Sequence, residues 1–130
     1  MASFSSDFLY TYPTFKPWVT GNAFGLEKWQ MGGIYELFYS VDFITVEMIF
    51  RGALVLGMIK LIGKDCILPM ISVYCFLHFG KPIGEAISSI FGGYFLGVIA
   101  INTQSVLGGS ILHIGVALMM EIFAYSQHFF

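Results

Sequence analysis

Charged residues are scarce in this sequence. They make up 11% of its 130 residues, whereas a soluble domain carries about 25%. So few charges cannot form the surface of an ordinary water-soluble domain. The basic residues are also spread along the chain, so the sequence lacks the basic patch that nucleic-acid binding requires. We therefore expect no nucleic-acid partner.

Cysteine is also rare. Cys66 and Cys75 are the two cysteines of the chain, and their spacing matches no zinc-finger pattern. Both lie in apolar sequence, where a free cysteine behaves as a small hydrophobic residue. We expect both to be packing residues without a disulfide bond.

Apolar residues dominate instead. They account for 57% of the chain, with 18% aromatic residues and a mean hydropathy of +0.79. A lipid bilayer accepts apolar side chains on every face of a helix. The sequence therefore predicts an all-α fold, a polytopic transmembrane helix bundle with about four membrane helices. The protein is expected to be an integral, multi-pass membrane protein in contact with the lipid bilayer.

The composition changes near residue 33. Residues 1–33 mix aromatic and polar side chains, which is typical of the membrane–water interface, so we expect an interfacial lead-in. Residues 34–130 form the predicted transmembrane helical domain. Its four helices are predicted at residues 34–62, 66–79, 83–101 and 106–125, followed by an interfacial tail.

The second of these predicted helices is short. It would measure on the order of 20 Å, against about 30 Å for the hydrocarbon core. We therefore expect it to end within the membrane, with the following turn buried in protein or facing a water-filled cavity.

The third predicted helix carries two stripes of small residues at four-residue spacing. One stripe is Gly84, Ser88 and Gly92, and the other is Ser89, Gly93 and Gly97. Small residues let membrane helices approach closely. We expect this helix to be the tightly packed centre of the bundle.

Ionisable side chains within apolar helices are costly in a membrane and mark functional candidates. Four stand out: Glu47, Arg51, His78 and His113. Glu47 and Arg51 are four residues apart, so they share a helix face and can pair. The alternative is structural, because an ion pair makes the helix tolerable in lipid and a lone histidine is often a packing residue. Four further carboxylates are expected to be solvated near helix ends: Glu36, Asp42, Glu85 and Glu121.

Two histidines and a carboxylate on separate helices suggest a site. Such a set can hold a divalent metal ion or position a water molecule for attack. The hypothesis therefore names Glu47, His78 and His113 as metal ligands, with zinc as the ion.

Three short motifs in order resemble those of a known family. Residues 46–52 resemble a Glu-Glu-x-x-x-Arg motif, residues 74–78 a Phe-x-x-x-His motif, and residues 113–117 a His-x-x-x-Asn or His-x-x-x-Asp motif. Together they resemble the CPBP family, the CAAX-protease and bacteriocin-processing (Abi-like) intramembrane metalloproteases. The resemblance covers about residues 36–121.

The resemblance implies an intramembrane endopeptidase that acts on prenylated C-terminal tails or membrane-embedded peptides. Glu47 would be the general base, oriented by Arg51. His78 and His113 would bind the metal ion or stabilise the oxyanion.

The sequence departs from the family pattern at two positions. Val46 stands where the family carries its first glutamate, which is expected to activate the attacking water. Ala117 stands where the family has Asn or Asp. Tyr74 replaces a phenylalanine, which keeps the ring and adds a hydroxyl. These departures indicate impaired catalysis.

Two other functions remain open. A non-catalytic homologue could act as a structural or scaffold subunit, with the Glu, Arg and His side chains kept as a buried polar network. The chain is short for the family, so we expect a fragment, a minimal protein, or a protein whose helices are covered by other membrane subunits. Alternatively, Glu47, His78 and His113 could form a proton or ion pathway.

Overall fold

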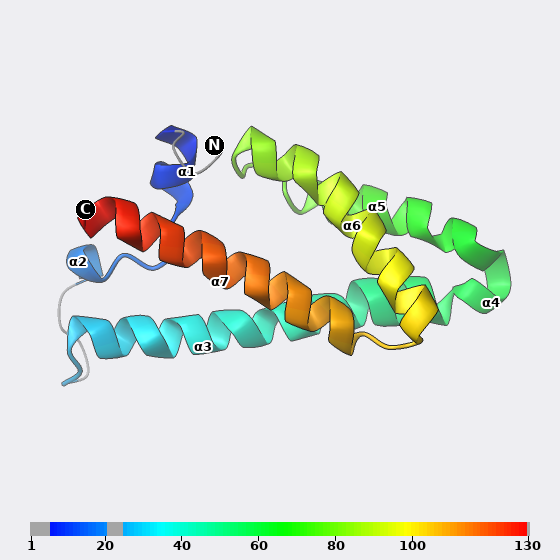
Figure 1. Cartoon of the computed structure of the whole chain (residues 1–130), viewed down its shortest axis with the longest axis horizontal. Coiled ribbons are helices and arrows are strands. Elements are labelled where there is room, and N and C mark those ends of the chain that lie inside the picture. The colour runs from blue at the N-terminus through cyan, green and yellow to red at the C-terminus, as the bar shows by residue number, and fades with distance from the viewer. Residues whose placement is uncertain (1–5, 21–24, 130) are drawn as a thin grey trace. The chain divides into compact units, whose positions relative to one another are not determined.

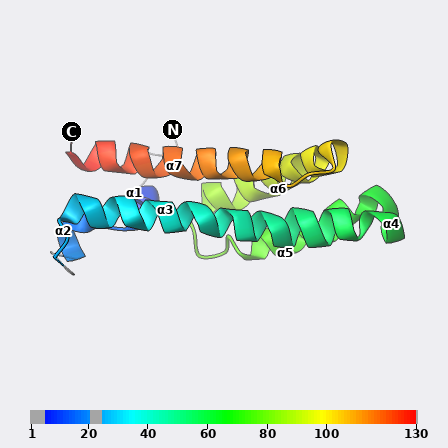
Figure 2. The ribbon, with the colours of Figure 1, turned by 90° about the horizontal axis from the view of Figure 1, so that it is seen from below.

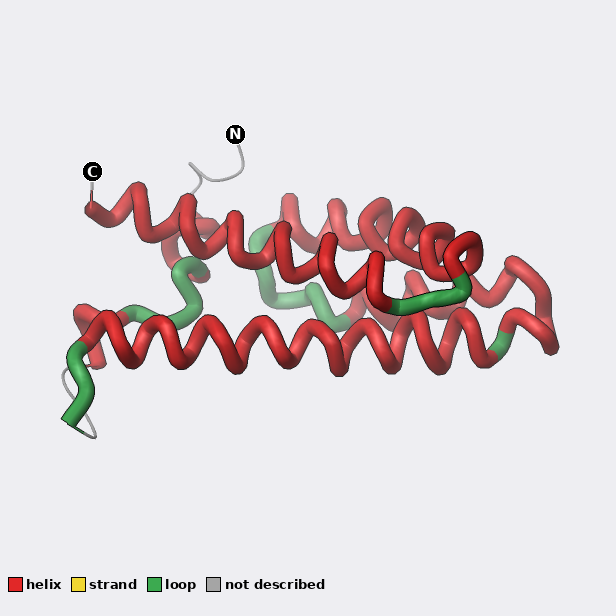
Figure 3. Tube along the Cα trace, turned by 60° about the horizontal axis from the view of Figure 1, so that its bottom comes forward, coloured by secondary structure: helices red, strands yellow, loops and turns green. Residues whose placement is uncertain are grey.

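The protein is described here by a computed structural model, which covers residues 6–20 and 25–129. Within these two ranges the elements are helices joined by loops, and no strand forms (Figure 3). This confirms the predicted all-α fold. Contacts divide the chain into two compact units, residues 43–113 and residues 1–42 with 114–130. The predicted boundary at residue 33 stays a prediction.

The first predicted membrane helix consists of three successive helical segments. They are α3 (Lys28–Glu47), η2 (Met48–Gly57) and α4 (Ile59–Ile62), which follow one another along the chain (Figure 2). The helix begins at Lys28, before the predicted residue 34, and no proline lies between Pro17 and Pro69 to interrupt it. The middle segment η2 is a π-helix, with hydrogen bonds from residue i to i+5.

The chain then turns into two adjacent helices. The 3-10 helix η3 (Gly63–Cys66) leads into α5 (Ile67–Phe76), and α6 (Ile83–Thr103) follows after a turn. Gly80 has a φ of 95° in this turn, a conformation that favours glycine. The ten residues of α5 span roughly 15 Å, about half of the hydrocarbon core.

In the part of the chain that the structure describes, two helices are long and apolar enough to cross a membrane. They are α6 and the main part of α7 (Leu107–Phe129). Among the described residues the other long helical stretch carries Glu36, Asp42, Glu47 and Arg51, and α5 is too short. The tail predicted to be interfacial continues as helix up to Phe129.

One of the two small-residue stripes packs as predicted. A Cβ added to Gly93 would lie 3.2 Å from Cδ1 of Tyr74, and one added to Gly97 would lie 3.1 Å from Cε of Met70. These contacts bring α6 close to α5, and Figure 1 shows the two helices side by side. The prediction is wrong for the other stripe, because a Cβ at Gly84 or Gly92 would meet nothing within 4 Å.

The unit formed by residues 43–113 has its own apolar core. The core joins η2, η3 and α5 and consists of six buried residues: Phe50, Val55, Cys66, Ile67, Met70 and Tyr74. Val46 and Leu54 pack against it. Cys66 and Cys75 are both free thiols, as expected from the sequence.

The other unit contains the N-terminal helices α1 (Ser6–Thr11) and α2 (Pro17–Thr20). Phe8 and Tyr12 of its first segment form a buried cluster with Ala124 of α7. The lead-in is therefore packed against a helix at these residues.

Glu121 contradicts the prediction that it would be solvated. Only 1% of it is exposed, and its Oε1 accepts hydrogen bonds from the Thr14 hydroxyl at 2.6 Å and the Thr14 backbone N–H at 3.1 Å. The prediction also fails at Glu36, whose two carboxylate oxygens are buried. Position near a helix end did not reveal that Thr14 of the N-terminal segment would bind Glu121.

Candidate functional site

The Glu47–Arg51 ion pair lies where α3 becomes η2. Glu47 is the last residue of α3, and Arg51 is in the first turn of η2. Nη1 of Arg51 donates to Oε1 of Glu47 at 2.9 Å, and both side chains are 0% exposed. The predicted pair is therefore present and shielded from water.

His113 of α7 binds the same carboxylate oxygen. Its Nδ1 lies 2.8 Å from Oε1 of Glu47, and 14% of the His113 side chain is exposed. An ionised carboxylate can only accept hydrogen bonds. His113 therefore carries a proton on Nδ1, and Oε1 accepts from both an imidazole and a guanidinium.

Tyr74 of α5 closes the other side of the His113 ring. The Tyr74 hydroxyl oxygen lies 3.1 Å from Nε2 of His113, and the Tyr74 residue is 4% exposed. In the neutral imidazole with its proton on Nδ1, Nε2 is an acceptor. The Tyr74 O–H therefore donates to Nε2, which produces a chain of hydrogen bonds from Tyr74 through His113 to Glu47.

The Tyr74 ring also holds the cation of the ion pair. Cζ of Arg51 lies 4.5 Å from the centroid of this ring, in reach of a cation–π interaction. Phe50 contacts the ring edge at a centroid distance of 5.3 Å. Tyr74 therefore contacts both His113 and Arg51. Together with Glu47, these three residues form the ion-pair cluster.

His78 joins the cluster through Tyr74 and does not contact Glu47. Its Nδ1 lies 3.0 Å from the backbone carbonyl oxygen of Tyr74, and its ring centroid is 4.7 Å from that of Tyr74. A carbonyl only accepts, so Nδ1 of His78 carries the proton. Within the described residues, Nε2 of His78 has no hydrogen-bond partner.

Three buried polar atoms of the cluster lack hydrogen-bond partners within the described part of the chain. They are Oε2 of Glu47 and Nε and Nη2 of Arg51. Buried polar groups are nearly always hydrogen-bonded, and exceptions call for an explanation such as a bound water or ligand. The same residue pair thus offers one free acceptor and two free donors.

Gly109 of α7 lies against the free carboxylate oxygen. A Cβ added at this position would be 2.7 Å from Oε2 of Glu47, which is shorter than any normal contact. Only a glycine leaves Oε2 in its present place.

The donor atoms do not fit the predicted three-ligand metal site. Both ring nitrogens of His113 are engaged by Glu47 and Tyr74, and His78 is held apart from the carboxylate by Tyr74. No group of three His, Cys, Asp or Glu side chains suited to a metal ion occurs among the described residues. The zinc ion named from the sequence therefore stays a prediction.

The two residues that depart from the motif pattern are both at least partly buried. Val46 is partly buried and packs against the core of its unit. Ala117 is 8% exposed and follows His113 by one turn of α7. Neither position offers a second carboxylate or an amide to the cluster.

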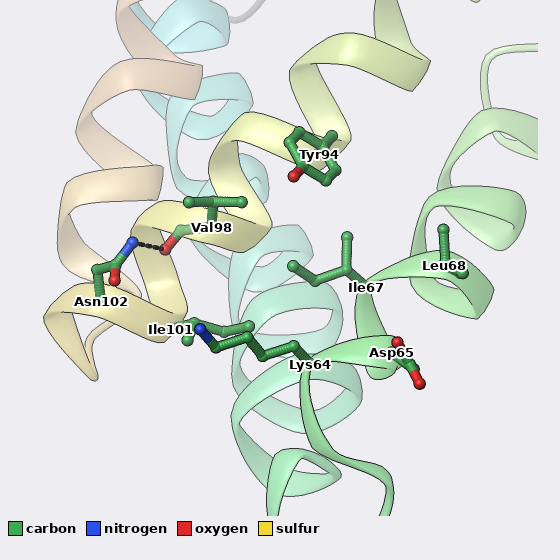
Figure 4. A pocket seen from close by; sticks show the side chains of 8 residues that line it. All are labelled: Lys64, Asp65, Ile67, Leu68, Tyr94, Val98, Ile101 and Asn102. Atoms are coloured by element: carbon green, nitrogen blue, oxygen red, sulfur yellow. Dashed lines mark hydrogen bonds between the residues drawn. The ribbon is translucent and has the colours of Figure 1, made fainter.

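A separate groove lies in the same unit, between the start of α5 and the second half of α6 (Figure 4). Its volume is about 380 Å³. Five apolar or aromatic side chains line it, together with Lys64, Asp65 and Asn102. None of the residues of the ion-pair cluster borders it.

Sequence reasoning missed two residues of the cluster. Tyr74 was treated as a mild replacement for phenylalanine, although its hydroxyl binds His113. Gly109 has no side chain, so nothing marks it in the sequence as part of the site. The signal for Tyr74 was available, because an added hydroxyl inside an apolar helix needs a partner.

The comparison with known families gives one match. The profile of the Rce1-like family, described as type II CAAX prenyl endopeptidase Rce1-like, matches residues 33–119. No curated protein and no solved structure matches the chain. The matched range contains all three motifs and all residues of the cluster, and it covers most of the chain. This protein therefore belongs to the Rce1-like family of type II CAAX prenyl endopeptidases.

Proposed function

We propose that this protein is an intramembrane endopeptidase that hydrolyses a peptide bond near a prenylated C-terminus, with Glu47 as the general base. Family membership supports the class of substrate. The observation that carries the proposal is the state of the Glu47 carboxylate. Oε1 is held by Arg51 and His113, while Oε2 is buried without a partner among the described residues.

The free oxygen suits a base that activates water. A water molecule bound to Oε2 would transfer a proton to Glu47 as its oxygen attacks the carbonyl carbon of the substrate. The carbon–nitrogen bond then breaks, and the leaving amine takes up the proton. General base catalysis of this kind contributes about 10²–10⁴-fold in rate.

Arg51 and His113 would keep the base in position. Their two hydrogen bonds to Oε1 fix the plane of the Glu47 carboxylate. The unpartnered Nε and Nη2 atoms of Arg51 are donors that could bind the developing oxyanion, a role of large effect in acyl transfer. His78, whose proton is on Nδ1, offers Nε2 as a hydrogen-bond acceptor toward the substrate.

Replacement of Glu47 tests this function. Purified protein in lipid nanodiscs would be given a peptide with a prenylated cysteine near its C-terminus, and the products measured by mass spectrometry. We expect Glu47→Gln to lower kcat by about 10²–10⁴-fold. Glu85→Gln is the matched control, because Glu85 pairs with Lys81 outside the cluster.

Two results would contradict the proposal. One is a wild-type rate in Glu47→Gln, provided that the unfolding temperature of the variant shows a folded protein. The other is the absence of cleavage by the wild-type protein with prenylated peptides of varied sequence.

A non-catalytic role is the second candidate, and the apolar replacements favour it. Val46 and Ala117 both remove a polar group that the family pattern places near the site. The fully buried Glu47–Arg51 pair would then be a structural network, and the protein would act as a scaffold subunit beside other membrane proteins. Affinity purification from gently solubilised membranes, with retention of stoichiometric partners and no cleavage activity, would support this role.

A further inference from the structure

The Tyr74 hydroxyl occupies the one nitrogen of His113 that Glu47 leaves free. Nδ1 of His113 is bound to Glu47 at 2.8 Å, and Nε2 is bound to Tyr74 at 3.1 Å. An imidazole with both nitrogens engaged has no lone pair for a metal ion and no site for a substrate proton. His113 can act on a ligand only after one of these bonds breaks.

The Tyr74 ring is held so that its hydroxyl cannot turn away. Arg51 covers the ring face at 4.5 Å, and the ring centroids of Phe50 and His78 lie at 5.3 and 4.7 Å. On the side of α6, Gly93 leaves no spare room, since an added Cβ would lie 3.2 Å from the ring. The position of the hydroxyl is therefore set by packing on several sides.

His78 differs from His113 in this respect. Its Nδ1 binds a backbone carbonyl, and its Nε2 is without a partner in the described part of the chain. The cluster thus contains one imidazole with both ring nitrogens hydrogen-bonded, His113, and one with an unbound nitrogen, His78. We call the first closed and the second open.

We propose that Tyr74 closes His113 against metal ions and substrate, so that His78 is the imidazole that meets the substrate. The first half of this proposal stands on the hydrogen bonds alone, and the second half rests on the proposed hydrolase function. His113 is then a positioning residue for Glu47. The sequence-based prediction gave both histidines the same role.

The wild-type protein provides the first test without any substitution. Side-chain ¹⁵N resonances of ¹⁵N-histidine-labelled protein in nanodiscs report which nitrogen carries the proton. We expect His113 to show a protonated Nδ1 and a hydrogen-bonded, unprotonated Nε2, and added Zn²⁺ to leave both resonances in place. A wild-type His113 whose Nε2 resonance moves on addition of Zn²⁺ would overturn the closure.

Tyr74→Phe removes only the hydroxyl and should open His113. We expect the apparent affinity for Zn²⁺, measured by calorimetry, to rise roughly tenfold or more, the size by which changes around a metal-binding imidazole usually act. The Nε2 resonance of His113 should then respond to Zn²⁺, and the gain should vanish in Tyr74→Phe with His113→Ala. Tyr94→Phe is the matched control, since Tyr94 is a half-exposed tyrosine of the same unit outside the cluster. Equal Zn²⁺ affinity in Tyr74→Phe and the wild type would overturn the closure.

Cleavage assays separate this proposal from the proposed function. If wild-type protein hydrolyses the prenylated peptide, and His78→Ala loses kcat while Nε2 of His113 stays bound to Tyr74, both proposals stand. If no variant cleaves the peptide but Tyr74→Phe binds Zn²⁺ through His113, the closure stands and the hydrolase function fails. If the wild type cleaves and His78→Ala keeps its kcat, the role assigned to His78 is wrong.

Discussion

Gly109 and Glu47 are in direct contact across the cluster, because a Cβ at Gly109 would lie 2.7 Å from Oε2 of the Glu47 carboxylate. The carboxylate is fixed on its other oxygen by Arg51 and His113, so it cannot retreat without loss of these bonds. The small size of residue 109 is therefore a condition for the position of the proposed base.

Gly109→Ala should destabilise the protein and disturb the site. We expect a loss of about 1–3 kcal/mol in the free energy of unfolding, the usual cost of overpacking, and a fall in kcat for the prenylated peptide. The matched control is Gly115→Ala on the same helix, where an added Cβ meets nothing within 4 Å and alanine favours the helix. Equal denaturation midpoints for the two variants would show that the Glu47 carboxylate moves freely.

The two i,i+4 ion pairs formed by described residues should differ strongly in their contribution to stability. Arg51→Met leaves the fully buried Glu47 without its guanidinium partner, and breaking such a pair costs about 3–5 kcal/mol. Lys81→Met breaks the Lys81–Glu85 pair, whose side chains are 35% and 16% exposed, and pairs near the surface contribute about 0–1 kcal/mol. Unfolding in mild detergent, followed by circular dichroism, measures both. Similar losses for the two variants would contradict the burial of the Glu47–Arg51 pair.

The packing of α6 on α5 predicts opposite behaviour at two neighbouring glycines. Gly93→Ala brings a Cβ to 3.2 Å from the Tyr74 ring, whereas Gly92→Ala adds one in open space. We expect Gly93→Ala to lower the unfolding temperature and Gly92→Ala to leave it unchanged or raise it, because alanine is the better helix former. A Gly92→Ala variant that is the less stable of the two would mean that the exposed stripe packs against something outside this chain.

Much of the helical architecture could be predicted because it follows from composition. The long apolar runs gave the helices after residue 83 to within a few residues at their starts, and small-residue spacing found the Gly93 and Gly97 face. The spacing could not show which of the two stripes would be packed, since the stripe with Gly84 and Gly92 has the same four-residue spacing as the stripe with Gly93 and Gly97. The π-helix at η2 was not predictable, because nearly all of its ten residues are apolar and so show no period that distinguishes it from an α-helix.

The candidate site was predictable only in part. Glu47 and Arg51 could be paired because their spacing within one helix determines their contact. The bond between Glu47 and His113 joins residues on α3 and α7, so it depends on packing that the sequence does not state. The separation of His78 from Glu47 by Tyr74 also depends on packing between helices. The sequence predicted three ligands around one centre, whereas the structure shows a chain of hydrogen bonds from Tyr74 through His113 to Glu47.

A carboxylate at position 46 provides the sharpest test of the catalytic state of the protein. Val46 precedes Glu47 by one residue, about 100° around the helix, and stands where the motif pattern has its first glutamate. We expect Val46→Glu to raise kcat for the prenylated peptide, since a second base would be placed beside a site that already holds Glu47. Its stability should fall, because Val46 packs against the apolar core and burial of a polar group is costly.

Val46→Gln is the control, because it has nearly the same size and hydrogen-bonding capacity without the negative charge. We expect it to lose stability as well but to gain no activity. If Val46→Glu and Val46→Gln both keep the wild-type kcat, position 46 takes no part in catalysis and Glu47 acts alone. If the wild type is inactive and only Val46→Glu cleaves the peptide, the native protein is the non-catalytic homologue, because the loss of one carboxylate is then sufficient to explain its inactivity.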